Sequence, residues 1–271
     1  MAENNIKHET TIFAEPIMHV GGFTVTNALL NSWMAVIILV LFFYAASRKI
    51  KKIPKGVQNV FEALLEGALN FSDSITGNRN KTVKVLPIAL ALFLFILVNN
   101  YLGLMPFIGS IGFVERIHGE NIFIPMFRGA TADLNTTLAL AIFSVAAIHI
   151  IGAFSVGVWN YTNRFINIKA LLEIPKKLRQ DKNVLMINPI KTFVSAIEIV
   201  GEAAKVASLS LRLFGNIFAG EVLLASMGAI FAFFIPIPFM FLEIIVGLVQ
   251  ALVFSILVLV FMSMATSAEE H

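Results

Sequence analysis

Residues 239–262 read FMFLEIIVGLVQALVFSILVLVFM, an apolar run with few polar residues in it. A helix needs about 20 mostly apolar residues to cross the hydrocarbon core of a bilayer, so this stretch is long enough to span a membrane. The apolar region around it extends over 188–265, far too long for one span. Because Pro236 and Pro238 would end a helix or force a turn, the region predicts two long membrane helices joined near those prolines.

The composition of the whole chain is that of a membrane protein. Of its 271 residues, 58% are hydrophobic and 14% are charged, and the mean hydropathy is +0.84. An ordinary soluble domain has about 25% charged residues, and disordered chains are polar and rich in charge. The sequence contains no cysteine, which excludes disulfides, iron–sulfur clusters and thiolate metal sites. These values predict an integral membrane protein.

Five segments are long and apolar enough to cross a membrane. They are 29–47, 85–105, 134–159, 189–235 and 239–265. Together they define a single membrane domain, 29–265, between an N-terminal segment, 1–28, and a short tail, 266–271. The predicted fold is therefore all-α, with five transmembrane helices of which the last two form a long helical hairpin.

Residues 57–75, between the first two spans, have a different pattern. Apolar residues recur there at spacings of three and four, and polar residues fill another face. This pattern is typical of an amphipathic helix, which more often lies on a membrane surface than crosses it. A helix that binds a partner protein would have the same pattern, so both interpretations remain open.

Lysine and arginine are concentrated in alternate loops. Five of them lie within 48–55, three within 79–84 and seven within 164–191, whereas 107–133 has only Arg116 and Arg128. The positive-inside rule places the basic loops in the cytoplasm, so we expect the N-terminus outside and the C-terminus inside. Since the loops account for the basic residues, the net charge of +3 does not indicate a nucleic-acid partner.

Ionisable residues also occur inside the last two predicted spans. They are Glu198, Glu202, Lys205, Arg212, Glu221 and Glu243. A charge at the centre of a membrane costs about 2.5–3.5 kcal/mol even on the lenient insertion scale, and such residues usually face a cavity or a partner. One pair could be a structural ion pair, but six groups in two adjacent helices indicate a path for ions.

Helical geometry arranges these groups by depth. At about 100° per residue, Arg212 shares one helix face with Glu198 and Asn216, and lies about 20 Å along the helix from Glu198. Glu221 lies about 13 Å beyond Arg212, and Glu243 is on the same, outer side. Arginine stays protonated at physiological pH and cannot relay protons as glutamate can. The order of charges therefore predicts a proton translocator in which an arginine separates two half-channels.

Residues 208–221, SLSLRLFGNIFAGE, resemble the signature of the a subunit of the F-type ATP synthase, the membrane stator that faces the rotating c-ring. Further matches are NNYLGLMP at 99–106, DLNTT at 133–137, QALVF at 250–254 and SMA at 263–265. The resemblance implies a tilted hairpin of the last two spans and a location in the bacterial plasma membrane. It implies as partners the c-ring, the b-subunit peripheral stalk, the other subunits of the complex and membrane lipid. No cofactor is expected, and ATP chemistry would belong to the partner subunits, because the chain has no GxxxxGK[ST] loop.

The resemblance also implies roles for single residues. Arg212 matches the essential arginine that meets the c-ring carboxylate, and Gln250 matches the polar residue close to it. Asn216 and Ser208 match polar positions on the water-accessible face. The outer half-channel is expected at Glu221 and Glu243, and the cytoplasmic half-channel at Glu198, with Glu202 and Lys205 beside it. Lys205 could equally have no role beyond pairing with Glu202.

The sequence departs from the family at the outer pair, where many members have one histidine and one glutamate but this chain has two glutamates. Two carboxylates close together are expected to share a proton. His149 could replace the missing histidine or could bond to a neighbouring helix, and Asp133 is a further candidate for the outer half-channel. A sodium ion is a second possible coupling ion, because its ligands would be carboxylate oxygens.

Two other classes of membrane protein are less consistent with the sequence. A secondary transporter often has duplicated halves, and no repeat is visible. An intramembrane protease or prenyl transferase would need a Gly-x-Ser-Gly motif or clustered aspartates, and the sequence has neither.

Overall fold

The computed structural model of the chain describes residues 11–48, 50–51, 56–105, 108–117, 120–165, 184–231 and 234–266. Residues 1–10 of the predicted N-terminal segment, 166–183 of the predicted basic loop and 267–271 of the predicted tail lie outside the described residues. In the described part, five helices are long and apolar enough to cross a membrane. They are α1 (Asn27–Ser47), α3 (Arg79–Gly103), α4 (Leu134–Val156), α8 (Val184–Ile230) and α9 (Pro236–Thr266). The prediction of an all-α integral membrane protein is confirmed.

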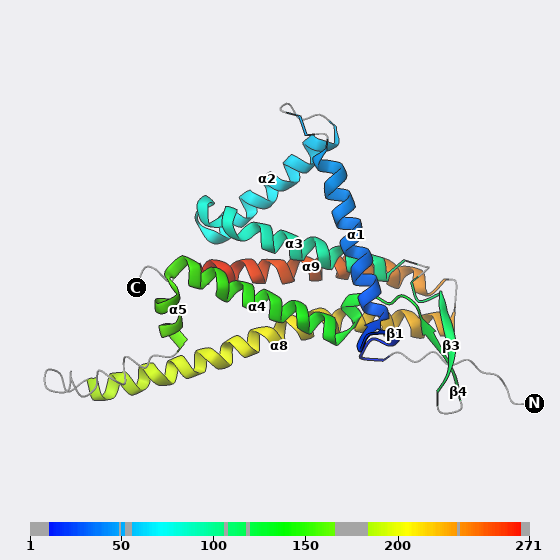
Figure 1. The fold of residues 1–271 in the computed structure, drawn as a ribbon. Helices are drawn as coiled ribbons and strands as arrows, with labels where there is room; N and C mark the ends of the chain where they lie inside the picture. Colours follow the sequence, from blue (N-terminus) through cyan, green and yellow to red (C-terminus); the bar gives the residue numbers. More distant parts are fainter. Residues whose placement is uncertain are drawn as a thin grey trace, which may run out of the picture.

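Four of the long helices run side by side, and α9 lies among the other three (Figure 1). It contacts α3, α4 and α8, while α4 also packs against α8. Helix α1 crosses one end of this bundle and contacts α3. The buried core is built from small and branched residues such as Ala141, Ala251 and Val258, together with Ile96 and Met262. Small residues at these positions let the helix backbones approach closely.

Helix α2 (Val57–Thr76) leads from the end of α1 back to the start of α3, so the three helices form a triangle in Figure 1. It ends at Gly77, whose φ of 69° is the left-handed conformation that glycine adopts readily at a helix C-terminus. Asn78 then caps α3 by accepting a hydrogen bond from the backbone of Asn80. Because this cap precedes the apolar run, α3 begins earlier than the apolar segment 85–105 predicted from hydropathy.

The break between the last two helices falls before the prolines. Helix α8 ends at Ile230, and Pro236 is the first residue of α9. Proline is well tolerated in the first turn of a helix, because the backbone N–H groups there have no partner within the helix. The prolines therefore begin α9, whereas the predicted spans 189–235 and 239–265 left them in the loop between the two helices.

Two short antiparallel hairpins were not predicted. The first pairs β1 (Pro16–Val20) with β2 (Phe23–Thr26), and the second pairs β3 (Gly112–Ile117) with β4 (Glu120–Pro125). Gly21 and Gly22 have φ values of 54° and 87°, which suit the tight turn between β1 and β2. Both hairpins lie at the same end of the bundle, opposite the short helix α5 (Val158–Phe165) and the C-terminus (Figure 1).

Candidate functional site

The predicted central arginine lies on an open face of α8. Its neighbours Leu209, Leu213 and Ile217 are buried against the bundle, whereas Arg212 and Asn216 are exposed. Helical periodicity explains the alternation, since residues four apart share a face. Among the described residues, the hydrogen-bond partner of Arg212 is Ser208, whose Oγ accepts from Nη2 at 3.3 Å. A guanidinium on the surface of an apolar helix needs a polar or anionic partner when that surface is in a membrane.

Gln250 lies on α9 and is half-buried. Its neighbour Ala251 is fully buried in the core. Within the described part of the chain, the structure has no hydrogen bond between Gln250 and Arg212, so their expected proximity stays a prediction.

A cavity of ≈ 290 Å³ lies next to the β3–β4 hairpin, and we call it the hairpin-side cavity. It contains both predicted outer carboxylates, Glu221 of α8 and Glu243 of α9. Asn100 is one of its further polar lining residues; it donates to the backbone oxygen of Gly247 at 2.8 Å and accepts from Thr131 at 2.7 Å. The structure thus brings residues from α3, α8 and α9 to one cavity.

Sequence reasoning missed a principal member of this cavity, Arg128. Its guanidinium binds Glu221 through two contacts, Nε to Oε1 at 3.1 Å and Nη2 to Oε2 at 3.0 Å. The same guanidinium donates to the backbone oxygens of Thr11 at 2.7 Å and Phe13 at 3.2 Å. Arg128 is only 4% exposed, and its planar fork matches the carboxylate geometry. One signal for Arg128 was present in the sequence: it and Arg116 are the only lysine or arginine residues in 107–133.

Glu243, the other carboxylate of this cavity, differs from Glu221 in its bonding. It is 7% exposed, and its Oε1 is buried without a hydrogen-bond partner among the described residues. Its carboxyl group lies against the backbone of Gly220 on α8, where a Cβ atom would overlap with it. Arg128 therefore pairs with one of the two carboxylates, and the sharing of a proton between Glu221 and Glu243 stays a prediction.

The side chain of Asp133 forms hydrogen bonds that stabilise the fold. It is 3% exposed and caps α4, with Oδ2 accepting from the backbone of Thr136 at 3.1 Å. Its Oδ1 accepts from the backbone of Ala14 at 3.1 Å, which ties the N-terminal segment to α4. These bonds are those of an N-cap, and they give Asp133 a role in holding the fold together.

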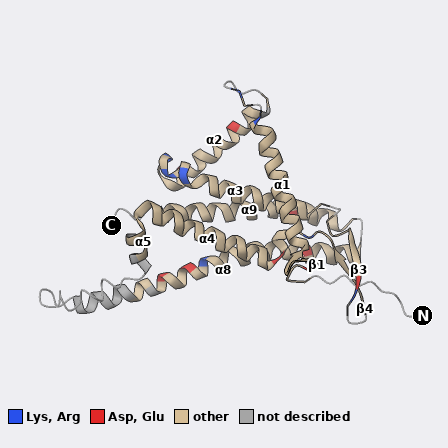
Figure 2. Ribbon diagram, in the orientation of Figure 1, with Lys and Arg blue, Asp and Glu red and all other residues tan. Residues whose placement is uncertain are grey.

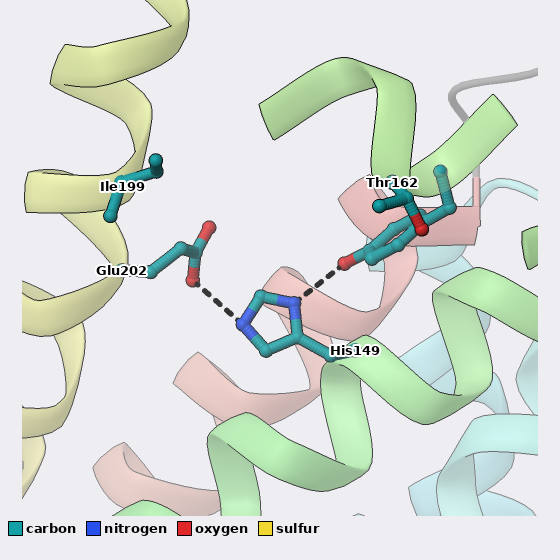
Figure 3. Close-up of a pocket in the computed structure, with 5 residues that line it drawn as sticks. His149, Thr162, Ile199 and Glu202 are labelled. Atoms are coloured by element: carbon teal, nitrogen blue, oxygen red, sulfur yellow. Dashed lines mark hydrogen bonds and ion pairs between the residues drawn. The ribbon is translucent and has the colours of Figure 1, made fainter. Parts of the chain in front are cut away.

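A second cavity of ≈ 340 Å³ lies near α5, and we call it the α5-side cavity. His149 of α4 lies in it, between Glu202 of α8 and a tyrosine of α5 (Figure 3). His149 Nδ1 is 2.8 Å from the hydroxyl of Tyr161, and Nε2 is 3.6 Å from Glu202 Oε2. The sequence predicts His149 as a candidate beside the outer carboxylates, whereas the structure places it beside Glu202, about 28 Å along α8 from Glu221. The alternative expectation, that His149 bonds to a neighbouring helix, is the one that fits.

Glu202 also pairs with Lys205, whose Nζ lies 2.7 Å from Oε1. Glu198 is half-buried one turn earlier on α8. Figure 2 shows these charges as a short row on α8, separate from the charges near the hairpins. Among the described residues, no group of three or more histidine, aspartate or glutamate side chains has the arrangement of a metal site.

Comparison with known proteins gives a consistent result. The model of the family described as "ATP synthase A chain" matches residues 29–263. A protein named ATP synthase subunit a from Syntrophobacter fumaroxidans is 32% identical over 252 residues, which is 93% of this chain and 87% of that protein. Proteins of the same name from Moorella thermoacetica and Mycobacterium bovis are 28% and 31% identical, and cover 91% and 92% of this chain and 94% and 91% of their own lengths.

Proposed function

The chain belongs to the ATP synthase A chain family, and from this membership we propose how its own residues move protons. As a multi-pass membrane protein of that family, it serves ATP synthesis through ion transport in the membrane sector and is not catalytic alone. In our proposal it provides two half-channels that deliver protons to the carboxylates of a c-ring and collect them again. Arg212 separates the two half-channels.

Arg212 is proposed to meet the ring carboxylate. The observation that carries this proposal is the exposure of a guanidinium on α8, with the exposed Asn216 one turn away. Its permanent positive charge would attract each ionised ring carboxylate and keep protons from passing directly between the half-channels. Ser208 would orient the guanidinium through the hydrogen bond that it accepts. Gln250 would contribute a polar group from α9.

The hairpin-side cavity is proposed as the outer half-channel. Glu243 is suited to exchange protons with water there, since its buried Oε1 has no hydrogen-bond partner among the described residues. Glu221 would shape the electrostatics of the cavity while paired with Arg128. The cytoplasmic half-channel is proposed to run along Glu198, Glu202 and Lys205.

The remaining parts of the proposal concern surroundings and partners. We propose a bacterial plasma membrane with the N-terminus outside and the C-terminus in the cytoplasm. The basic residues at the corner between α2 and α3 support this orientation, because they lie toward the C-terminal end of the bundle and away from the hairpins (Figure 2). Partners would be the c-ring, the b-subunit peripheral stalk, other subunits of the complex, and lipid around the apolar helices.

The test uses the whole complex reconstituted in liposomes in sodium-free buffer. Arg212→Ala should abolish ATP-driven proton pumping while the complex remains assembled. Arg212→Lys should pump little better than Arg212→Ala, because lysine lacks the planar fork of the guanidinium and can lose its proton when desolvated. The matched control is Leu211→Ala, an exposed neighbour without a polar group, which should pump normally. Normal coupled pumping by an assembled Arg212→Ala complex would overturn the proposed function, and pumping that depends on added sodium would replace the proton by sodium.

A further inference from the structure

The side chains around the α5-side cavity form a continuous row across four helices. Phe261 of α9 lies under Lys205, whose Nζ is 4.9 Å from the ring centre. Lys205 binds Glu202, Glu202 approaches His149 of α4, and His149 contacts Tyr161 of α5. Four of these groups, Lys205, Glu202, His149 and Tyr161, can lose or gain a proton, and histidine in general does so near neutral pH.

Lys205 fixes the orientation of the Glu202 carboxylate. The ammonium group occupies Oε1, which leaves Oε2 directed at His149 (Figure 3). Oε2 is buried and has no hydrogen-bond partner among the described residues. Its distance of 3.6 Å from His149 Nε2 exceeds that of an N–H···O bond, about 2.7–3.2 Å. A small side-chain rotation would close the remaining gap.

Tyr161 fixes the other side of the imidazole and suits both of its protonation states. Its hydroxyl can donate to Nδ1 of a neutral ring or accept from Nδ1–H of an imidazolium. The tyrosine ring packs against Gly152 of α4, where a Cβ atom would lie 2.6 Å from it. The absence of a side chain at Gly152 therefore lets Tyr161 reach His149.

The geometry points to a proton-exchange site at His149, with Glu202 as its partner and Lys205 and Tyr161 as positioning residues. This inference rests on the proposed function and adds to it the group that exchanges protons on the cytoplasmic side. A proton that arrives from the c-ring side binds Oε2 of Glu202 and passes to the unprotonated Nε2, which leaves the carboxylate ionised and paired with Lys205 and the ring as an imidazolium. The imidazolium then releases the Nδ1 proton to water in the cavity, and exchange of the remaining ring proton with that water resets the tautomer.

The cavity has room for the water that this exchange needs. Its ≈ 340 Å³ far exceeds the about 10–15 Å³ that one water molecule requires by the same measure. Among the groups that face His149 in the described part of the chain are Glu202, with Glu198 and Lys205 near it on α8, and Tyr161 on α5. A purely structural ion pair between α4 and α8 would use the same contacts, but it would not need an imidazole that loses and regains a proton.

The experiment compares variants of the whole complex in liposomes with the cytoplasmic face toward the bath. Proton flux is measured during ATP synthesis driven by a potassium diffusion potential, at bath pH values from about 6 to about 8, on either side of the ordinary histidine pKa of about 6.5. His149→Gln keeps a hydrogen-bonding side chain that cannot gain or lose a proton, so flux should fall several-fold and its profile against bath pH should flatten. His149→Ala should be slow as well, and added imidazole should restore its flux.

Two further variants separate a proton-exchange role from a packing role. Thr162→Val changes a cavity residue whose hydroxyl bonds to the backbone of Val158, so flux should stay at the wild-type rate. Tyr161→Phe keeps the ring against Gly152 but removes the hydroxyl, so it should shift the pH profile. Wild-type flux and pH dependence in His149→Gln, or no effect of imidazole on slow His149→Ala complexes, would overturn the inference. The loss of pumping in Arg212→Ala would be unaffected by either result, so the two proposals can fail separately.

Discussion

The two cavities of this protein hold similar chemical groups in opposite arrangements. In the hairpin-side cavity, Arg128 and Glu221 are joined by two short contacts, and the buried guanidinium is also bonded to the N-terminal segment. In the α5-side cavity, His149 and Glu202 are 3.6 Å apart, and each is partly exposed. The first arrangement fixes charge, and the second leaves room for a charge to change.

This difference follows from the side chains themselves. Arginine remains charged at physiological pH, so its ion pair is permanent. Histidine can be neutral or charged, so a contact with glutamate changes strength with its protonation. In both cavities one carboxyl oxygen lacks a hydrogen-bond partner among the described residues, on Glu243 and on Glu202. Each cavity thus contains a carboxylate held by a cation, Glu221 by Arg128 and Glu202 by Lys205, and a carboxyl oxygen without such a bond.

The largest expected effect on stability comes from breaking the ion pair between Arg128 and Glu221. Arg128→Ala would leave Glu221 charged without its partner, and because Glu221 is 32% exposed the cost should lie at or below that of a fully buried pair, about 3–5 kcal/mol. We expect a marked fall in the thermal stability of the detergent-solubilised complex. Arg128→Ala combined with Glu221→Gln should recover part of the loss, because no unpaired charge remains. Equal stability of the single and double variants would contradict a paired role for Arg128.

A second prediction contrasts the two outer glutamates. Glu221→Gln would deprive the buried Arg128 of its anion, so stability should fall by about 1–3 kcal/mol. Glu243→Gln breaks no hydrogen bond described in the structure, so stability should change little while proton flux falls. Thermal unfolding and flux measured on the same preparations separate the two. The double variant should be slower still, yet coupled, and wild-type flux in it would exclude the pair from the outer path.

The close approach of α8 and α9 at Gly220 gives a third prediction, again about stability and flux. Gly220→Ala would place a methyl group where the Glu243 carboxyl lies, and overpacking of this kind costs about 1–3 kcal/mol. We expect lower stability together with slower flux. Gly228→Ala is the matched control, because nothing lies within 4 Å of its Cβ position and alanine favours a helix. Similar results for the two variants would show that the cavity tolerates a displaced Glu243.

The smallest effect is expected outside both cavities, where α2 meets α3. The nearby Thr82 side chain and the Arg79 guanidinium, which donates to Oδ2 at 2.6 Å, hold the pKa of Asp73 below its ordinary value of 3.8. The ionised carboxylate is therefore favoured in the folded state, and its contribution is present above that value and lost as the pH falls through the folded pKa. Asp73→Asn should reduce thermal stability slightly at neutral pH, because the pair with Arg79 is exposed. The difference from the wild type should shrink in acid, and a difference that grows in acid would contradict the assignment.

Hydropathy predicted the long helices well. A helix that crosses a bilayer must have a certain length and an apolar composition, and both can be read directly from a local stretch of sequence. Periodicity along α8 also predicted that Arg212 and Asn216 share a face, and both are exposed. It could not find Arg128 or the position of His149, since their partners are far apart in sequence: Arg128 meets Thr11 and Glu221, and His149 meets Glu202. The first hairpin had a readable signal in Gly21 and Gly22, which adjoin β-branched and aromatic residues.

The bonds of Arg128 also concern how the chain is made. They join Thr11, before the first membrane helix, to Glu221, near the end of the fourth. A ribosome releases Thr11 long before Glu221, because synthesis proceeds from the N-terminus. The guanidinium cannot meet its carboxylate until α8 has entered the membrane, so this cavity is among the last parts of the protein to form. A chain whose insertion stops before α8 therefore lacks the proposed outer half-channel and cannot dissipate the proton gradient through it.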